Sequence, residues 1–190
     1  MTISRRSVIF ATAAALGSLA SCKDPSASTA GSAPAALPVP SGPTAAVASA
    51  LPVMGPAPSW KLRDIAGREV SSDEFKGKVV VVDFWATWCG PCKEEIPGYV
   101  ELQKKHGDKG FVIVGVSLDQ QGPPVVKRYA ESAKINYPLV MGDDSVVAAF
   151  GGIDAIPTTF LIDREGRIRH RKVGSMDTVE YEKLITPLLE

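Results

Sequence analysis

A long apolar run that ends just before two closely spaced cysteines constrains this chain more than any other feature of its sequence. Residues 78–86 read KVVVVDFWA, and their β-branched apolar side chains predict a strand buried on both faces, as in a parallel sheet. Apolar residues at helical spacing then predict a helix over residues 92–106, which ends at Gly107. The tetrapeptide Cys89-Gly90-Pro91-Cys92 therefore lies where a buried strand gives way to a helix.

This position favours a redox-active pair as the interpretation of the two cysteines. The unpaired backbone N–H groups and the dipole at a helix N-terminus stabilise an anion, so Cys89 is expected to form the thiolate and to act as the nucleophile. Cys92 lies one turn into the helix. It is expected to be more buried and to be the resolving thiol.

Three other roles exist for cysteines at this spacing: a structural disulfide, half of a zinc site, or a dithiol that carries Cu(I). A zinc site lacks ligands, because the only other cysteine is Cys22 and the two histidines fall in unrelated elements. These histidines, His106 and His170, are each expected to be exposed surface residues. No metal centre and no cofactor are therefore expected. Copper binding stays open, because two thiolates suffice for Cu(I).

Strand and helix signals alternate through the rest of the C-terminal part of the chain. Two short strands, 60–64 and 68–70, are predicted to form a hairpin around Ala66-Gly67. A turn at residues 164–166 is predicted to form a second hairpin. The order of elements predicts an α/β fold, with a central mixed sheet flanked by helices. Further strands are predicted at 111–118, 137–140, 158–163 and 167–173, and further helices at 125–134, 143–150 and 177–189.

The segment VVVVDFWATWCGPCKEEIP, residues 79–97, resembles the active-site region of the thioredoxin superfamily nearly residue for residue. Within that superfamily the chain is most similar to the TlpA and ResA-like branch of membrane-attached bacterial reductases, over about residues 56–190. The resemblance implies a thioredoxin-like fold with an N-terminal β-hairpin, and with an inserted helix and strand within residues 122–140. It also implies that Cys89 and Cys92 form the redox-active disulfide of a thiol-disulfide oxidoreductase.

The resemblance assigns catalytic roles to two acidic residues. Asp83 matches the buried acid beneath the dithiol of thioredoxins. A carboxyl group in an apolar strand has a raised pKa, which suits it to take the Cys92 proton, directly or through water. Glu95 matches an acid that the ResA-like branch keeps near its active site, and it lies three residues past Cys92. A solvent-facing position for Asp83 and an exposed first-turn position for Glu95 are the structural alternatives.

The resemblance also identifies residues beside the dithiol. Ile156-Pro157-Thr158 matches the cis-proline loop of the superfamily, in which the proline offers no N–H and the Ile156 backbone pairs with a substrate strand. Trp85 is expected in the core and Trp88 on an exposed rim beside the dithiol. Gly90 and Pro91 complete the surface that a substrate protein is expected to contact.

The first 21 residues have the layout of a lipoprotein-type export signal. Arg5 and Arg6 precede an apolar run of 13 residues, Val8 to Ala20, which is shorter than the about 20 residues that a membrane-spanning helix needs. Leu19-Ala20-Ser21-Cys22 resembles the bacterial lipobox, so Cys22 is the predicted lipidation site. Ser4-Arg5-Arg6 also resembles the start of a twin-arginine motif, and export by the general secretory route is an equal alternative.

Residues 22–58 comprise this cysteine and a linker rich in Ala, Pro and Ser, which is predicted to be disordered. The thioredoxin-like domain is predicted to cover residues 59–190. The chain has 21 basic and 21 acidic side chains, and removal of residues 1–21 deletes two arginines, so 19 basic and 21 acidic groups leave a formal charge of −2. No basic cluster matches a row of phosphates, and no nucleic acid partner is expected.

The predicted activity is the reduction of disulfides in extracytoplasmic partner proteins, by an enzyme anchored through lipid at Cys22 to the periplasmic or outer face of a bacterial membrane. The Gly-Pro dipeptide between the cysteines is that of thioredoxin, whose reduction potential is about −270 mV, and it favours a reductase. Such an enzyme needs a membrane dithiol electron donor, because glutathione cannot recharge it in an oxidising compartment.

The resemblance suggests two classes of substrate: the haem-attachment cysteines of apocytochrome c, and the cysteines of copper-insertion proteins or cytochrome oxidase. Two other functions stay open. One is a Cu(I)-binding metallochaperone lipoprotein, which the lack of Met or His beside the motif disfavours. The other is a disulfide oxidase or isomerase on the same fold, which a much less reducing potential would identify.

Overall fold

The computed structural model describes residues 51–190. Every strand and helix expected from the sequence is present in it, with bounds that differ by at most a few residues. The strands are β1 (Gly55–Pro56), β2 (Lys61–Asp64), β3 (Glu69–Ser71), β4 (Val79–Trp85), β5 (Phe111–Ser117), β6 (Leu139–Met141), β7 (Thr158–Ile162) and β8 (Arg167–Val173). The α-helices are α1 (Gly90–His106), α2 (Pro123–Ala133), α3 (Asp144–Ala149) and α4 (Thr178–Leu189), and short 3-10 helices are η2 (Ser72–Phe75) and η3 (Gly107–Lys109).

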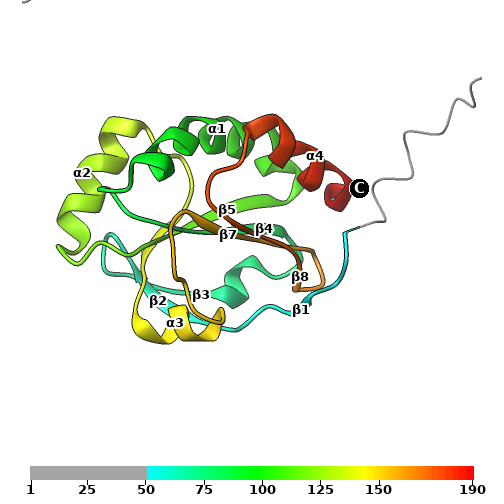
Figure 1. Cartoon of the computed structure of the whole chain (residues 1–190), viewed down its shortest axis with the longest axis horizontal. Coiled ribbons are helices and arrows are strands. Elements are labelled where there is room, and N and C mark those ends of the chain that lie inside the picture. Colours follow the sequence, from blue (N-terminus) through cyan, green and yellow to red (C-terminus); the bar gives the residue numbers. More distant parts are fainter. Residues whose placement is uncertain (1–50) are drawn as a thin grey trace, which may run out of the picture. The chain divides into compact units, whose positions relative to one another are not determined.

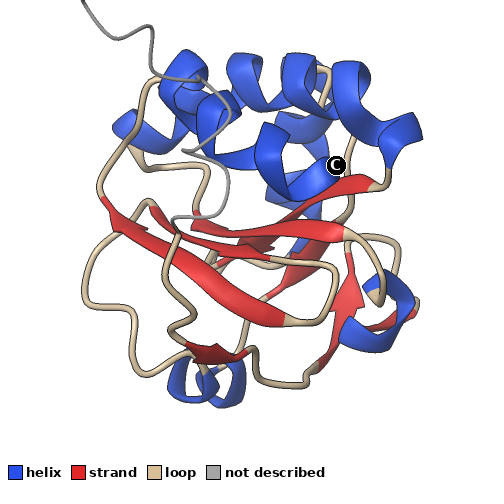
Figure 2. Ribbon diagram, turned by 90° about the vertical axis from the view of Figure 1, so that its right-hand side faces the viewer, coloured by secondary structure: helices blue, strands red, loops and turns tan. Residues whose placement is uncertain are grey.

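The strands form one eight-stranded sheet in the order β1-β8-β7-β4-β5-β6-β2-β3. Helices α1, α2 and α4 cover one face of this sheet, and α3 lies on the other (Figure 1). Figure 2 shows the same layers from the side. β4 pairs in parallel with β5 and antiparallel with β7, and β6 continues the parallel part beyond β5. The sheet is therefore mixed and the fold is thioredoxin-like, as the sequence predicts.

The central strand β4 anchors hydrophobic packing on both faces of the sheet. All seven of its residues are buried, as the apolar run predicts. Because side chains alternate along a strand, odd-numbered residues such as Val81 pack under α1 and α4, and even-numbered ones such as Val82 pack on the opposite face. Full burial of each such side chain contributes about 1.5–3 kcal/mol. This packing fixes the position of β4, and with it the C-terminal end of the strand, from which the chain continues to the cysteines.

Helix α1 begins where local chemistry favours a helix N-terminus. Cys89 is the N-cap residue, and its Sγ accepts a hydrogen bond from the N–H of Cys92 at 3.2 Å. Pro91 lies in the first turn, where its missing N–H leaves no helical hydrogen bond unmade. Lys104 and Lys105 lie in the last turn, where their charges interact favourably with the helix dipole.

The N-terminal hairpin and the inserted elements are both present. β2 and β3 pair antiparallel, and the insertion consists of α2 and β6, with β6 between β5 and β2. One further strand has no counterpart in the sequence analysis: β1 pairs with β8, although residues 55–56 fall within the linker by composition. The Arg169 guanidinium also donates to the Leu51 carbonyl at 2.6 Å. Composition does not reveal such pairing, because β8 supplies the partner groups.

The structure corrects the prediction that both histidines are exposed. His106, the last residue of α1, is 3% exposed. Its ring packs edge-to-face on Phe111 with centroids 6.3 Å apart, and its Nε2 lies 2.6 Å from Glu182 Oε1. His170 is half-buried in β8, and burial lowers its pKa, with the Lys172 charge adding to this effect. His106 follows a buried leucine by four residues, and this helical spacing was the signal for its burial.

The predicted export signal, the lipidation site Cys22 and most of the linker lie outside the described residues. Within residues 51–190, no helix is both long enough and apolar enough to cross a membrane.

Candidate active site

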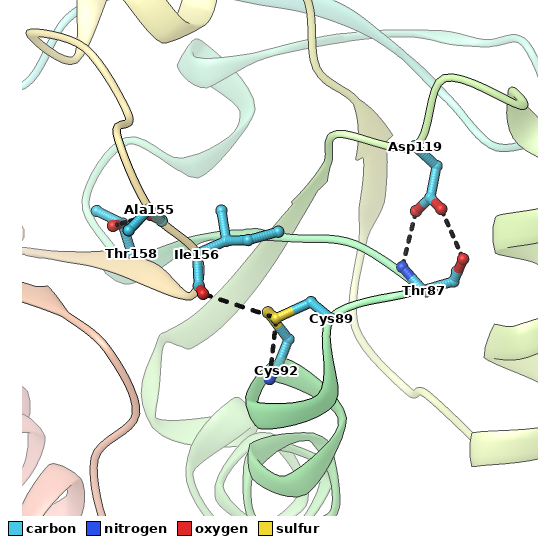
Figure 3. The surroundings of a disulfide bond; sticks show 7 residues. All are labelled: Thr87, Cys89, Cys92, Asp119, Ala155, Ile156 and Thr158. Carbon is cyan, nitrogen blue, oxygen red and sulfur yellow. Dashed lines mark hydrogen bonds between the residues drawn. A yellow bond between two sulfur atoms is a disulfide. The ribbon is translucent and has the colours of Figure 1, made fainter.

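The two cysteines of the tetrapeptide form a disulfide at the N-terminal end of α1 (Figure 3). Their sulfur atoms are 2.01 Å apart, and their Cα atoms are 5.3 Å apart. Cys89 is 5% exposed and Cys92 is 2% exposed, so Cys92 is the more buried of the two, as predicted. The Cys92 N–H that points at Cys89 Sγ is one of the free donors of the first helical turn. It is positioned to stabilise a thiolate when the disulfide is reduced.

The loop before β7 lies beside the disulfide. The peptide bond between Ile156 and Pro157 is cis, as the sequence analysis expects. The Ile156 carbonyl oxygen is 3.7 Å from Cys89 Sγ, and the Thr158 hydroxyl donates to the Ala155 carbonyl at 2.7 Å (Figure 3). Backbone groups of the loop before β7 are thus next to Cys89 Sγ.

Asp83 lies in β4 between Val81 and Trp85, on the face of the sheet that α1 covers, and is 2% exposed. Gly115 of β5 and Thr159 of β7 are its neighbours across the sheet. Within residues 51–190, Asp83 Oδ1 has no hydrogen-bond partner. Burial raises the pKa of Asp83 well above its usual range, and the negative charge of Glu95 raises it further. The solvent-facing alternative for Asp83 is therefore wrong.

Glu95 is 7% exposed and points away from the exposed side of α1. Its Oε1 accepts the N–H of Met176 at 2.7 Å, which ties the segment between β8 and α4 to the helix that carries the cysteines. Burial raises the pKa of Glu95, and the hydrogen bond from Met176 opposes that shift. Glu95 is thus a buried acid near the dithiol, and the exposed first-turn alternative is wrong.

Two buried tyrosines complete this polar region, and the sequence analysis did not identify them. The rings of Tyr99 in α1 and Tyr181 in α4 meet edge-to-face with centroids 5.7 Å apart. The Tyr99 hydroxyl interacts with the Glu95 carboxyl group, and the Tyr181 hydroxyl interacts with the Thr159 hydroxyl. Burial raises the pKa of both phenols, and the negative charge of Asp83 adds to the shift. Tyr99 carries the helical periodicity of an apolar residue, and nothing local distinguishes it from one.

Of the two tryptophans near the dithiol, Trp85 is buried and Trp88 is exposed, as predicted. Trp85 is 1% exposed within the core, whereas Trp88 is 66% exposed immediately before Cys89. Gly90 and Pro91 are also exposed. These exposed residues and Ile156 form the surface around the dithiol that is available to a partner protein. Within residues 51–190, no three His, Cys, Asp or Glu side chains lie together as a set of metal ligands.

Asp119 is another buried side chain near the dithiol that sequence reasoning missed. It follows the end of β5 by two residues and hydrogen-bonds to Thr87, which lies two residues before Cys89. Asp119 does not lie within an apolar strand, so no hydrophobic pattern in the sequence predicts that it is buried. Only the pairing of β4 with β5 brings Asp119 and Thr87 together.

Comparisons with known proteins agree with this geometry. A model of the AhpC/TSA family matches residues 35–171. The chain is 36% identical over 135 residues to the thiol-disulfide oxidoreductase ResA of Bacillus subtilis, covering 69% of this chain and 74% of that protein. It is 32% identical over 128 residues to the thioredoxin-like protein YneN of the same organism, covering 67% and 75%.

A solved structure shows the same fold. The crystal structure of a thiol:disulfide interchange protein from Chlorobium tepidum TLS superposes with a TM-score of 0.67 at 37% identity, covering 72% of this chain and 97% of that one. The dithiol at a helix N-terminus supports two-electron thiol-disulfide exchange. The chain thus belongs to the AhpC/TSA family and is, within it, a thioredoxin-fold thiol-disulfide oxidoreductase of the TlpA/ResA-like kind.

Proposed function

We propose that this oxidoreductase is an extracytoplasmic, lipid-anchored reductase of disulfides in partner proteins. The observation that carries the proposal is the Cys89–Cys92 disulfide at the start of α1, together with the buried acid Glu95 three residues past Cys92 and the buried Asp83, whose pKa Glu95 influences. A Gly-Pro pair between the cysteines supports the reducing direction, because thioredoxin, with a potential of about −270 mV, has the same dipeptide.

In the proposed reaction, the Cys89 thiolate attacks one sulfur of the partner's disulfide. That S–S bond breaks, the other partner sulfur leaves as a thiolate, and a mixed disulfide joins Cys89 to the partner. Cys92 then loses its proton and attacks Cys89 Sγ, which breaks the mixed disulfide. The partner gains two electrons, and its two leaving thiolates take up protons from the solvent, so that it departs as a dithiol while the enzyme is oxidised to the Cys89–Cys92 disulfide.

Asp83 is the proposed acceptor of the Cys92 proton. Its carboxylate is buried and has a raised pKa, so it is a stronger base than an exposed carboxylate. Glu95 is proposed as a second acid that sets the charge of this region, because its negative charge raises the pKa of Asp83. Trp88, Gly90, Pro91 and the Ile156 backbone are proposed to contact the partner.

The reduction potential tests this proposal most directly. We expect the potential of the Cys89–Cys92 couple to lie below about −230 mV in defined dithiothreitol or glutathione buffers, with no copper retained in the same preparation. A potential near −120 mV would instead identify a disulfide-forming oxidase. Stoichiometric Cu(I) with negligible disulfide turnover would overturn the reductase in favour of a metallochaperone.

The proposed partners follow from the direction of electron flow. A reductase in an oxidising compartment needs a membrane dithiol donor, and its proposed substrates are the haem-attachment cysteines of apocytochrome c or cysteines of copper-site assembly. Support for this location comes from the export-type N-terminus and the lipobox-like sequence that ends at Cys22.

Replacement of the predicted lipidation site tests the location. We expect wild-type protein in the membrane fraction of the host cell and Cys22→Ser in the soluble extracytoplasmic fraction, because each acyl chain contributes about 0.8 kcal/mol per buried methylene. Mass spectrometry of the N-terminal peptide would detect the acyl groups. Equal membrane association of both proteins would show that lipid at Cys22 is not the anchor.

A further inference from the structure

The short segment that joins β4 to the active-site helix determines where Cys89 lies. It consists of Ala86, Thr87 and Trp88, and within it the Cys89 N–H donates to the Ala86 carbonyl at 3.1 Å. Trp88 is 66% exposed, so core packing on this residue does not hold the segment. Its position must come largely from Ala86, which is fully buried, and from contacts made by Thr87.

Asp119 supplies those contacts. Its Oδ2 accepts the Thr87 N–H at 2.9 Å, and its Oδ1 accepts the Thr87 hydroxyl at 2.6 Å (Figure 3). Both carboxylate oxygens therefore bind one residue, which fixes the backbone and the side chain of Thr87 at once. Hydrogen bonds to a charged acceptor are roughly twice as strong as those between neutral groups.

The carboxylate is itself held in place by its neighbours. The Ser117 hydroxyl donates to Asp119 Oδ2 at 2.8 Å, and the Asp119 N–H donates back to Ser117 Oγ at 3.1 Å. Ser117 is fully buried and Asp119 is 7% exposed, so little water competes for these bonds. The Leu118 N–H donates to the Trp85 carbonyl at 2.8 Å, which extends the pairing of β4 and β5 to the base of the segment.

We propose that Asp119 is a positioning residue for thiol-disulfide exchange, because through Thr87 it fixes the segment that carries Trp88 and Cys89. The segment leads directly into the N-cap, where Cys89 Sγ accepts the Cys92 N–H and lies 3.7 Å from the Ile156 carbonyl. A thiolate must attack a disulfide along a defined line, and a displacement of about 1 Å can lower a rate about a hundredfold. Asp119 thus acts on the reaction through Thr87 and not by contact with the partner.

The placement of Asp119 distinguishes this role from a purely structural one. β4 and β5 pair through seven consecutive residues without it, and Asp119 does not belong to either of the two hydrophobic clusters that pack on the faces of the sheet. Loss of the contact to Thr87 should therefore change the exchange reaction more than it changes the free energy of unfolding.

The test uses the full chain and a matched pair of substitutions at Thr87. Thr87→Val removes the hydroxyl donor at nearly constant volume, and Thr87→Ser retains that donor. We expect Thr87→Val to lower kcat/KM for reduction of a disulfide-bonded peptide by about tenfold, the size expected for one hydrogen bond to a charged group. Thr87→Ser should restore most of this loss. Asp119→Ala, which removes both bonds to Thr87, should lower kcat/KM by about a hundredfold.

A second readout separates positioning from general damage. The pH dependence of Cys89 alkylation by iodoacetamide reports the stability of its thiolate, and we expect its midpoint to rise in Thr87→Val and Asp119→Ala but not in Thr87→Ser. Thr186→Val is the control, because its hydroxyl is exposed on α4 and donates only to the Glu182 carbonyl. If Asp119→Ala and Thr87→Val unfold more easily yet keep wild-type kcat/KM and alkylation midpoints, the proposal is wrong.

Discussion

The Cys92→Ser variant is expected to stop after the first step of the reaction and to accumulate a mixed disulfide between Cys89 and the partner protein. Cys92 is the nucleophile that resolves this species, and its sulfur is bonded to Cys89 Sγ in the oxidised enzyme. A serine hydroxyl is far too weak a nucleophile to replace it. Multiple turnover should therefore fall by about a thousandfold or more, while the first attack on the partner proceeds.

Non-reducing electrophoresis and mass spectrometry of the conjugate would measure the trapped species. Cys89→Ser is the matched control and should form no conjugate, because its remaining active-site thiol, Cys92, is only 2% exposed. Both variants retain Cys22, so a conjugate that also forms in Cys89→Ser would show attack from another cysteine. Normal turnover by Cys92→Ser would contradict the two-cysteine mechanism.

The Asp83→Asn variant is expected to be more stable than wild type at neutral and alkaline pH and slower in the second step of exchange. Burial raises the folded-state pKa of Asp83, whereas the unfolded chain ionises at about 3.9. The folded state therefore binds the proton more tightly. The stability that Asp83 contributes is fully present below about pH 4 and is lost as the pH rises through the raised pKa.

Asparagine carries no charge at any pH, so Asp83→Asn removes this loss. Denaturant unfolding of the oxidised proteins should give stability curves that converge near pH 4 and separate as the pH rises. The rate at which Cys92 resolves the mixed disulfide should fall about a hundredfold, because a positioned base contributes at least that factor. Asp108→Asn is the control, because Asp108 is exposed. It should change neither the pH dependence of stability nor the rate at which Cys92 resolves the mixed disulfide. If the free energy of unfolding of Asp83→Asn and that of wild type change with pH in parallel, ionisation of Asp83 does not destabilise the folded state, and the prediction is wrong.

Local sequence patterns predict most of the fold, because they report on interactions between residues close together in the chain. The apolar run of β4 and the helical spacing of α1 each appear where predicted. Their junction alone places Cys89 at the N-cap, since no other segment of the chain is needed to form that helix end. The burial of Asp83 was predictable for the same reason, because its neighbours in the sequence are Val82 and Phe84.

Other features depend on which distant segments meet, and a single sequence does not contain that information. Glu95 is a first-turn helix acid by sequence, and only the approach of Met176 from the segment before α4 makes it a buried one. His106 is buried because α1 lies against Phe111 and α4. The two residues of β1 are a strand only because β8 offers them partners.

The sequence by itself determined the redox chemistry of this protein, because a CxxC motif needs only a strand, a turn and a helix start to bring its two sulfurs together. The tertiary structure alone decided the surroundings of that dithiol. Asp119 binds Thr87, which lies 32 positions before it in the chain. Ile156 contacts Cys89, which lies 67 positions before it. These contacts follow from the pairing of β4 with β5 and β7. The sequence of a strand does not reveal which distant strand it pairs with, so these contacts could not be predicted from the sequence.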